Sequence, residues 1–147
     1  MRHGIAYWMT GAFACCGVLV SLWSCGGNRS ERHRAFSGRV ITVSERLLQG
    51  DVTDTLRFGR LHAGETARLE TGIRNAGSDP IVLVREETTC GCTRLEYDAR
   101  PILPGDTLRM AVLFDTSGQR GWQFKVVRLY FSSGARPLRL YIDAEVE

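Results

Sequence analysis

The stretch Ala67-Arg-Leu-Glu-Thr-Gly-Ile-Arg-Asn-Ala-Gly-Ser-Asp-Pro-Ile-Val-Leu-Val84 decides the fold class of this chain. From Ala67 to Arg74, small or apolar residues alternate with charged residues or glycine. This alternation predicts a β-strand with one face toward a core. Asn75–Pro80 then supplies a turn, and Ile81–Val84 predicts a second, more fully buried strand.

The chain on either side repeats this pattern of short strands and turns. Pro101–Asp106 is another turn, and its Pro-Gly pair suits a type II turn. No window shows a sustained helical period, so no long helix is expected. Further strands are predicted at Val40–Val43, Leu56–Phe58, Leu108–Phe114, Trp122–Phe131 and Leu138–Val146. About seven or eight strands in total predict an all-β fold, a single antiparallel β-sandwich.

The composition is that of a globular domain with little net charge. Of the 147 residues, 44% are hydrophobic and 24% are charged, which argues against bulk disorder. This length allows one domain of common size with a single core. The formal net charge is +3, and basic and acidic residues interleave along the chain. We therefore expect no nucleic-acid partner.

The first 25 residues have the pattern of an export signal. Arg2 and His3 precede an uncharged segment, Gly4–Ser24, which ends in Leu-Trp-Ser before Cys25. A basic start, an apolar run and a small residue at the end are typical of a signal peptide. A cysteine at the next position resembles the lipobox of bacterial lipoproteins. That resemblance implies cleavage between Ser24 and Cys25 and attachment of lipid to the Cys25 thiol.

The predicted domains follow from this signal: a signal peptide at 1–24, a flexible polar tether at 25–39 and a β-sandwich at 40–147. Two alternatives to the lipoprotein remain open. The apolar run is long enough to span a bilayer uncleaved, since about 20 residues suffice. However, Arg29, Arg32 and Arg34 follow the run, against the positive-inside tendency for such an anchor. The other alternative is ordinary signal cleavage without lipid.

Several short motifs, taken in order, resemble a bacterial family described as domain of unknown function 1573. The motifs are Phe58-Gly59-Arg60-Leu61, Arg74-Asn75-Ala76-Gly77, Thr89-Cys90-Gly91-Cys92-Thr93, Ile102-Leu103-Pro104-Gly105-Asp106 and Phe114-Asp115-Thr116. The resemblance runs from about Leu56 to Val146. It implies an immunoglobulin-like (Ig-like) sandwich, similar to Hydin-type and major-sperm-protein domains. It also implies a lipoprotein on the periplasmic or outer-membrane side of a Gram-negative, Bacteroidetes-type bacterium. The family has no established activity, so the resemblance implies a fold and a site of interest only.

That site is the pair Cys90 and Cys92. If Cys25 carries lipid, these are the two cysteines of the mature chain that can pair, and a disulfide is the first hypothesis in an oxidising compartment. Residues i and i+2 of a strand lie about 6.6 Å apart, whereas bridged Cβ atoms need about 3.8 Å. The bond therefore requires a bend at Gly91, which glycine permits.

Three readings of this pair remain open. The cysteines can be a structural or buried pair, a labile redox pair, or ligands of a soft metal ion such as Cu(I). Zinc would need two further ligands. Nothing in the spacing ties His33 or His62 to the two cysteines.

No catalytic motif is present, and we expect neither an enzyme nor a cofactor. Glu86 and Glu87 are neighbours on a predicted strand, so they should point to opposite faces rather than form an acid/base pair. Four aromatic residues are candidates either for a ligand-binding patch or for core and cross-strand partners: Trp122, Phe124, Tyr130 and Tyr141.

The sequence thus predicts a lipid-anchored binding or scaffolding module with the membrane and a protein as partners. The alternative is a thiol redox or soft-metal-handling protein that uses Cys90 and Cys92.

Overall fold

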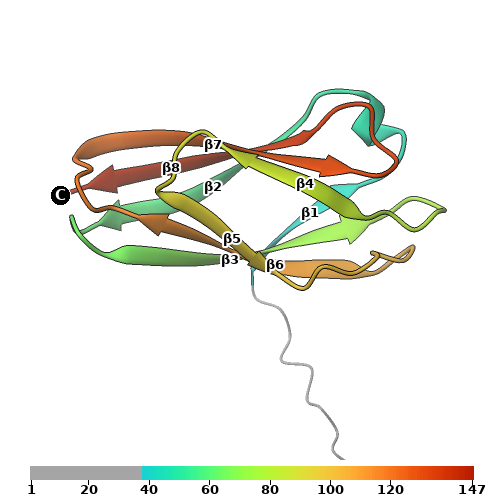
Figure 1. The fold of residues 1–147 in the computed structure, drawn as a ribbon, viewed down its shortest axis with the longest axis horizontal. Coiled ribbons are helices and arrows are strands. Elements are labelled where there is room, and N and C mark those ends of the chain that lie inside the picture. The colour runs from blue at the N-terminus through green and yellow to red at the C-terminus, as the bar shows by residue number, and fades with distance from the viewer. Residues whose placement is uncertain (1–37) are drawn as a thin grey trace, which may run out of the picture. The chain divides into compact units, whose positions relative to one another are not determined.

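The structure, a computed structural model, describes residues 38–147. The predicted signal peptide, with Ser24 and Cys25, and all but the end of the tether lie outside the described residues. Eight strands and one short 3₁₀ helix, η1, follow in order (Figure 1). They are β1 (Arg39–Val43), η1 (Leu47–Gln49), β2 (Val52–Leu61), β3 (Thr66–Asn75), β4 (Leu83–Thr88), β5 (Thr93–Tyr97), β6 (Thr107–Asp115), β7 (Gly121–Phe131) and β8 (Leu138–Val146). None of the described helices is long and apolar enough to cross a membrane.

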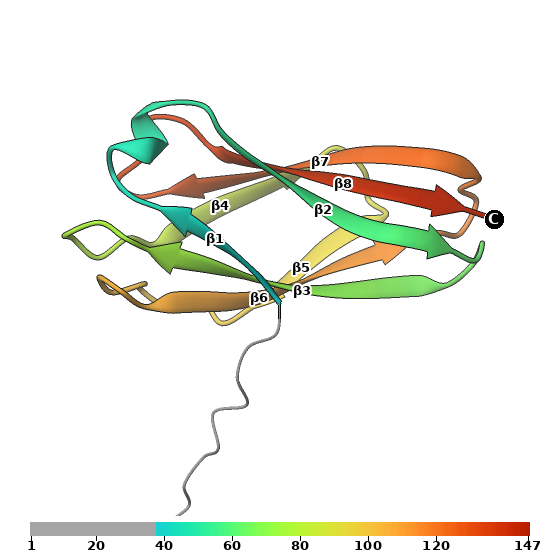
Figure 2. The same cartoon turned by 180° about the vertical axis from the view of Figure 1, so that it is seen from behind.

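The strands form two four-stranded sheets that pack face to face. One sheet has the order β1-β3-β6-β5 and the other the order β2-β8-β7-β4. Figures 1 and 2 show them as two layers from opposite sides. The prediction of an all-β chain with a single β-sandwich is confirmed.

The prediction of a purely antiparallel arrangement is wrong at one edge of each sheet. β1 pairs with β3 in parallel, and β2 pairs with β8 in parallel. Both pairs join strands that no tight hairpin connects, so local turn geometry does not set their direction. The direction of each strand is decided by its pairing with a distant strand. The residue pattern within a single strand does not indicate that pairing.

The predicted buried strand Ile81–Val84 is also different in the structure. Ile81 forms an isolated bridge with Ile102, and β4 begins only at Leu83. A shift of register between Leu83 and Arg85 turns Val84 outward, where it is 61% exposed. The bulge therefore converts an apolar run into a strand with one buried face.

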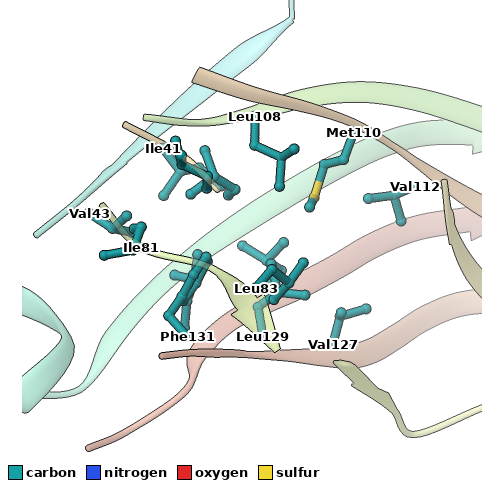
Figure 3. Packing of buried hydrophobic residues seen from close by; sticks show 14 of the residues in the cluster. Ile41, Val43, Ile81, Leu83, Leu108, Met110, Val112, Val127, Leu129 and Phe131 are labelled. Carbon is teal, nitrogen blue, oxygen red and sulfur yellow. The ribbon is translucent and has the colours of Figure 1, made fainter. Parts of the chain in front are cut away.

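The core lies between the sheets and is built by the predicted alternation. In β6, the residues Leu108, Met110, Val112 and Phe114 are all buried. In β8, Leu138, Leu140, Ile142, Ala144 and Val146 are buried too. Figure 3 shows side chains of the two sheets pointing toward one another. A smaller cluster lies at one end of the sandwich, where Phe58 meets Phe114 edge to face at 6.0 Å.

A buried amide joins two turns at the other end of β3. The Asn75 Nδ2 donates to the carbonyls of Asp79 (2.8 Å) and Ile102 (2.9 Å), and its Oδ1 accepts from the Gly77 amide at 2.9 Å. In the second turn, the Asp106 amide donates to the Leu103 carbonyl at 2.9 Å, and Gly105 has a φ of 83°. These features confirm the predicted type II turn.

A tyrosine connects the two sheets at one edge of the sandwich. Partial burial and a hydrogen bond to Glu86 raise the pKa of Tyr97 to about 12. This contact links β5 of one sheet to β4 of the other.

The register of β8 makes the first testable prediction. Leu140 is fully buried, whereas Arg139 makes an ion pair with Asp51 that is partly exposed. Leu140→Ala should lower the free energy of unfolding by about 2–5 kcal/mol. Arg139→Ala should cost about 1 kcal/mol or less. Urea unfolding of the two variants measures the difference, and equal losses would contradict the register.

Candidate functional sites

The cysteine loop is the connection between β4 and β5 that carries Cys90, Gly91 and Cys92. It passes from one sheet to the other, as the yellow segment of Figure 1 shows. The structure joins the two sulfur atoms in a disulfide, with the Cα atoms 5.1 Å apart. This separation is shorter than the repeat of about 6.6 Å in an extended strand, so the chain bends at Gly91.

Backbone hydrogen bonds hold both cysteines, and the Cys90 carbonyl accepts the Thr93 amide at 3.2 Å. The Cys92 carbonyl accepts the Asp115 amide of β6 at 2.8 Å, and the Cys92 side chain packs against the small cluster around Phe114. The Cys92 amide donates to the Cys90 Sγ at 3.1 Å. An amide aimed at sulfur favours its thiolate form. Both cysteines are half-buried.

The structure brings no metal-binding cluster to this loop. Within residues 38–147, no group of three or more His, Cys, Asp or Glu side chains is placed to hold a metal ion. His33 lies outside the described residues together with Arg29, Arg32 and Arg34.

The adjacent carboxylates of β4 have separate partners. Glu87 pairs with Arg85 and accepts from the Tyr130 hydroxyl at 2.9 Å. Glu86 instead interacts with Tyr97. The two carboxylates therefore contact different tyrosines, Glu86 on β5 and Glu87 on β7.

Three of the four candidate aromatic residues come together. The Trp122 and Phe124 rings stack with centroids 5.8 Å apart, and the Phe124 and Tyr141 rings stack at 5.1 Å. We call these three residues the aromatic row. It lies on the outer face of the β2-β8-β7-β4 sheet, with Trp122 66% and Phe124 48% exposed. Tyr130 belongs elsewhere, because it lies under the Arg85 guanidinium, 4.0 Å from its ring centroid.

A hollow of about 230 Å³ adjoins the aromatic row. It is lined by residues of β2, β7 and β8, among them Arg57, Gly59, Arg60, Trp122, Asp143 and Glu145. Sequence reasoning missed the β2 and β8 residues as a site. Their meeting depends on the parallel pairing of β2 with β8, which nothing in either segment indicates.

A second hollow, of about 460 Å³, lies where the edges of the two sheets meet. We call this region the β2–β3 seam. Its lining includes Arg39, Leu56, Arg57, Arg68, Leu69 and Glu70. β6 pairs with β3 from Thr66 to Arg74, whereas β1 pairs with it only from Thr71 to Asn75. The β1 side of Thr66–Glu70 therefore has no strand neighbour among the described residues.

The fold is similar to domains of two proteins with solved structures. The sandwich is similar to a crystal structure of a protein of unknown function from Porphyromonas gingivalis W83, with a TM-score of 0.55 and 24% identity. That match covers 62% of this chain and 43% of the other. It is also similar to the VesB protease of Vibrio cholerae, with a TM-score of 0.53 and 11% identity over 65% of this chain and 30% of the protease. The chain thus spans less than half of either protein, and the likeness shows the fold alone.

No protein of curated function matches the chain. The sequence profile of the family described as "Protein of unknown function (DUF1573)" matches residues 51–146. The match covers most of the described sandwich, including the cysteine loop and the aromatic row. The chain therefore belongs to the DUF1573 family of proteins of unknown function.

Proposed function

We propose that this chain is an exported lipoprotein of the cell envelope whose Ig-like sandwich binds a protein partner. The segment Gly4–Ser24 followed by Cys25 supports the export and the lipid anchor. On this proposal the chain scaffolds its partner close to the membrane and catalyses no reaction.

The observation that carries the binding role is the open half of β3. Unpaired strand edges are templates for another chain, and many binding domains use them to add an extended peptide to a sheet. Here the unpaired residues Thr66–Glu70 adjoin a hollow of about 460 Å³. A partner segment could extend the sheet at this point, in line with β1.

The lining of the seam indicates which segment would bind. Leu69, which is partly buried, supplies apolar surface, and Leu56 lies beneath it at 1% exposure. Arg57 is exposed, and its side chain makes no ion pair or hydrogen bond among residues 38–147. Arg39 and Arg68 are already paired, with Asp54 and with Glu70 and Glu96 respectively. We therefore propose an extended segment with one apolar side chain and a carboxylate placed to meet Arg57.

Site-specific crosslinking in the native cell tests the seam. A photoreactive residue in place of Glu70 should form a crosslink to one protein. Leu69→Ala should reduce the yield of that crosslink, because the substitution removes apolar contact surface from the hollow. The control is the same photoreactive residue in place of Val84, which is exposed on β4 at the opposite edge. Equal capture from both positions, or crosslinks only to this chain's own residues before Gly38, would overturn the proposal.

The anchor has its own test. Cys25→Ala removes the thiol to which lipid would attach, so it should abolish labelling by a fatty-acid analogue and leave unprocessed precursor. Labelling and gel mobility of the two proteins measure this. Unchanged labelling in the variant would refute the lipid anchor.

A second candidate function rests on the cysteine loop. The disulfide is half-buried, and the Cys92 amide is placed to stabilise a Cys90 thiolate. Exchange would reduce the Cys90–Cys92 bond to two thiols while two thiols of a partner are oxidised to one disulfide. Two electrons and two protons pass to this chain, so the step is balanced.

Redox behaviour separates this candidate from a structural pair. The loop closed by the bond is very short, so the bond adds little stability and the Cys90→Ser, Cys92→Ser variant should keep its fold. The bond should open in mild thiol buffer, with a potential above about −300 mV. Mass spectrometry detects the disulfide as a loss of two hydrogens. If both thiols stay free in air and no metal co-purifies, the redox and metal functions are excluded together.

A further inference from the structure

The aromatic row exposes two large rings on the outer face of β7. β7 alternates, with Gln123 and Val127 toward the interior and Trp122 and Phe124 toward solvent. Phe124 stacks against the Trp122 indole, yet Trp122 stays 66% exposed. Trp and other aromatic side chains left open beside a hollow mark binding sites more often than random surface.

The sheet register surrounds these rings with charges in ordered rows. Asp143 of β8 lies between Phe124 of β7 and Arg57 of β2. In the next row, Glu145 lies between Trp122 and Arg60. Phe124 and Trp122 are therefore each followed across the sheet by a carboxylate and then by a guanidinium.

One of these carboxylates fixes the indole. The Trp122 Nε1 donates to Asp143 Oδ1 at 2.7 Å, which holds the ring at the side of the hollow. The side chains of Glu145 and Arg57 make no hydrogen bond or ion pair among residues 38–147, and both line the hollow. Their hydrogen-bonding capacity is available to a ligand.

The space itself suits a small ring. The hollow measures about 230 Å³, below the range of roughly 300–1,000 Å³ for sites of drug-sized ligands. Gly59 has a φ of 76°, and a side chain there would meet no neighbouring atom. This glycine leaves the β2 wall open, so a ligand can approach the backbone.

The charges that line the hollow balance, so the lining as a whole favours neither anions nor cations. Two carboxylates and two guanidiniums line the hollow, so an anion would meet Asp143 and Glu145 and a cation would meet Arg57 and Arg60. Like charges placed together cost several kcal/mol in an interface. A neutral group that both donates and accepts hydrogen bonds satisfies both kinds of side chain.

From these features we infer that the hollow beside Trp122 binds one ring of a neutral saccharide. The apolar face of the sugar packs against the open part of the indole. Its hydroxyls donate to the Glu145 carboxylate and accept from the Arg57 guanidinium. This site is separate from the β2–β3 seam proposed for the protein partner, although Arg57 lies between the two hollows.

Tryptophan fluorescence provides the test. The full chain is used in a detergent without a sugar headgroup. It carries Trp8→Phe and Trp23→Phe, so that Trp122 alone emits whether or not the signal peptide has been cleaved. The probes are neutral hexasaccharides of glucose, mannose, galactose and N-acetylglucosamine, each titrated to about 10 mM because a single ring binds weakly. At least one should give a saturable change of Trp122 emission.

Variants show whether the change comes from the proposed contacts. Glu145→Gln and Arg57→Gln should each weaken binding about tenfold, since hydrogen bonds to charged groups contribute about 1.5–3 kcal/mol. The matched control Arg139→Gln lies on the same sheet face, outside the lining of the hollow, and should leave affinity unchanged. In Trp122→Ala, calorimetry should find no binding of the best hexasaccharide.

Three results would overturn the inference: no response to any neutral probe, a response only to an anionic hexasaccharide of galacturonic acid, or equal affinity in Glu145→Gln and the unsubstituted protein. A response only to peptides would assign the hollow to the protein partner instead. Crosslinking at position 70 is read separately, so failure here leaves the proposed protein binding untouched.

Discussion

The buried amide of Asn75 is the interaction on which the register of one whole sheet depends. Its side chain satisfies two carbonyls and one amide from two different turns. Its backbone also donates to the Asp106 carbonyl and accepts from the Gly105 amide. A buried polar group that loses its partners costs about 1–3 kcal/mol, so alternative alignments of the two turns are penalised. The end of β3 is thereby fixed against the start of β6, and the two strands stay in unbroken register along the length of their pairing.

The same turn determines where the seam lies. The Ala76 amide, next to Asn75, donates to the Val43 carbonyl at 2.7 Å and so holds the end of β1. β1 is only five residues long, so counting back from Val43 it reaches Arg39 opposite Thr71. The rest of β3 is left without a neighbour on that side within the described sandwich. A short edge strand beside a long one thus produces both the unpaired backbone and the hollow beside it.

Sequence patterns predicted the features that depend on a single segment, such as strands and their buried faces. They missed the features that depend on pairing between distant segments. The alternation at Leu108–Phe114 and at Leu138–Val146 predicted both strands and their buried faces, because side-chain period follows from backbone geometry alone. The apolar residue Val84 was misplaced, because a bulge against β7 turns it outward.

The aromatic row was predicted in part. Trp122 and Phe124 share a strand face, and Tyr141 joins them only through the register of β8 against β7. Tyr130 lies farther along β7, beside Arg85 of β4. The bend at Gly91 followed from covalent geometry, whereas the redox behaviour of the cysteines is decided by surroundings that no motif specifies.

The topology also separates the cysteine loop from the β2–β3 seam, whereas the seam and the hollow beside the aromatic row share Arg57. β4 and β5, which the cysteine loop joins, are the edge strands at one side of the sandwich, and β1 and β2, which border the seam, are the edge strands at the other. Opening the Cys90–Cys92 bond therefore breaks no contact of the seam. The aromatic row is closer to the loop, because the Thr89 amide and hydroxyl both bond to Val126 of β7, whose cross-strand neighbour is Tyr141. That pair of hydrogen bonds is independent of the sulfur atoms. Reduction of the disulfide therefore removes neither of these hydrogen bonds directly, and both connect the loop to the strand that carries Trp122 and Phe124.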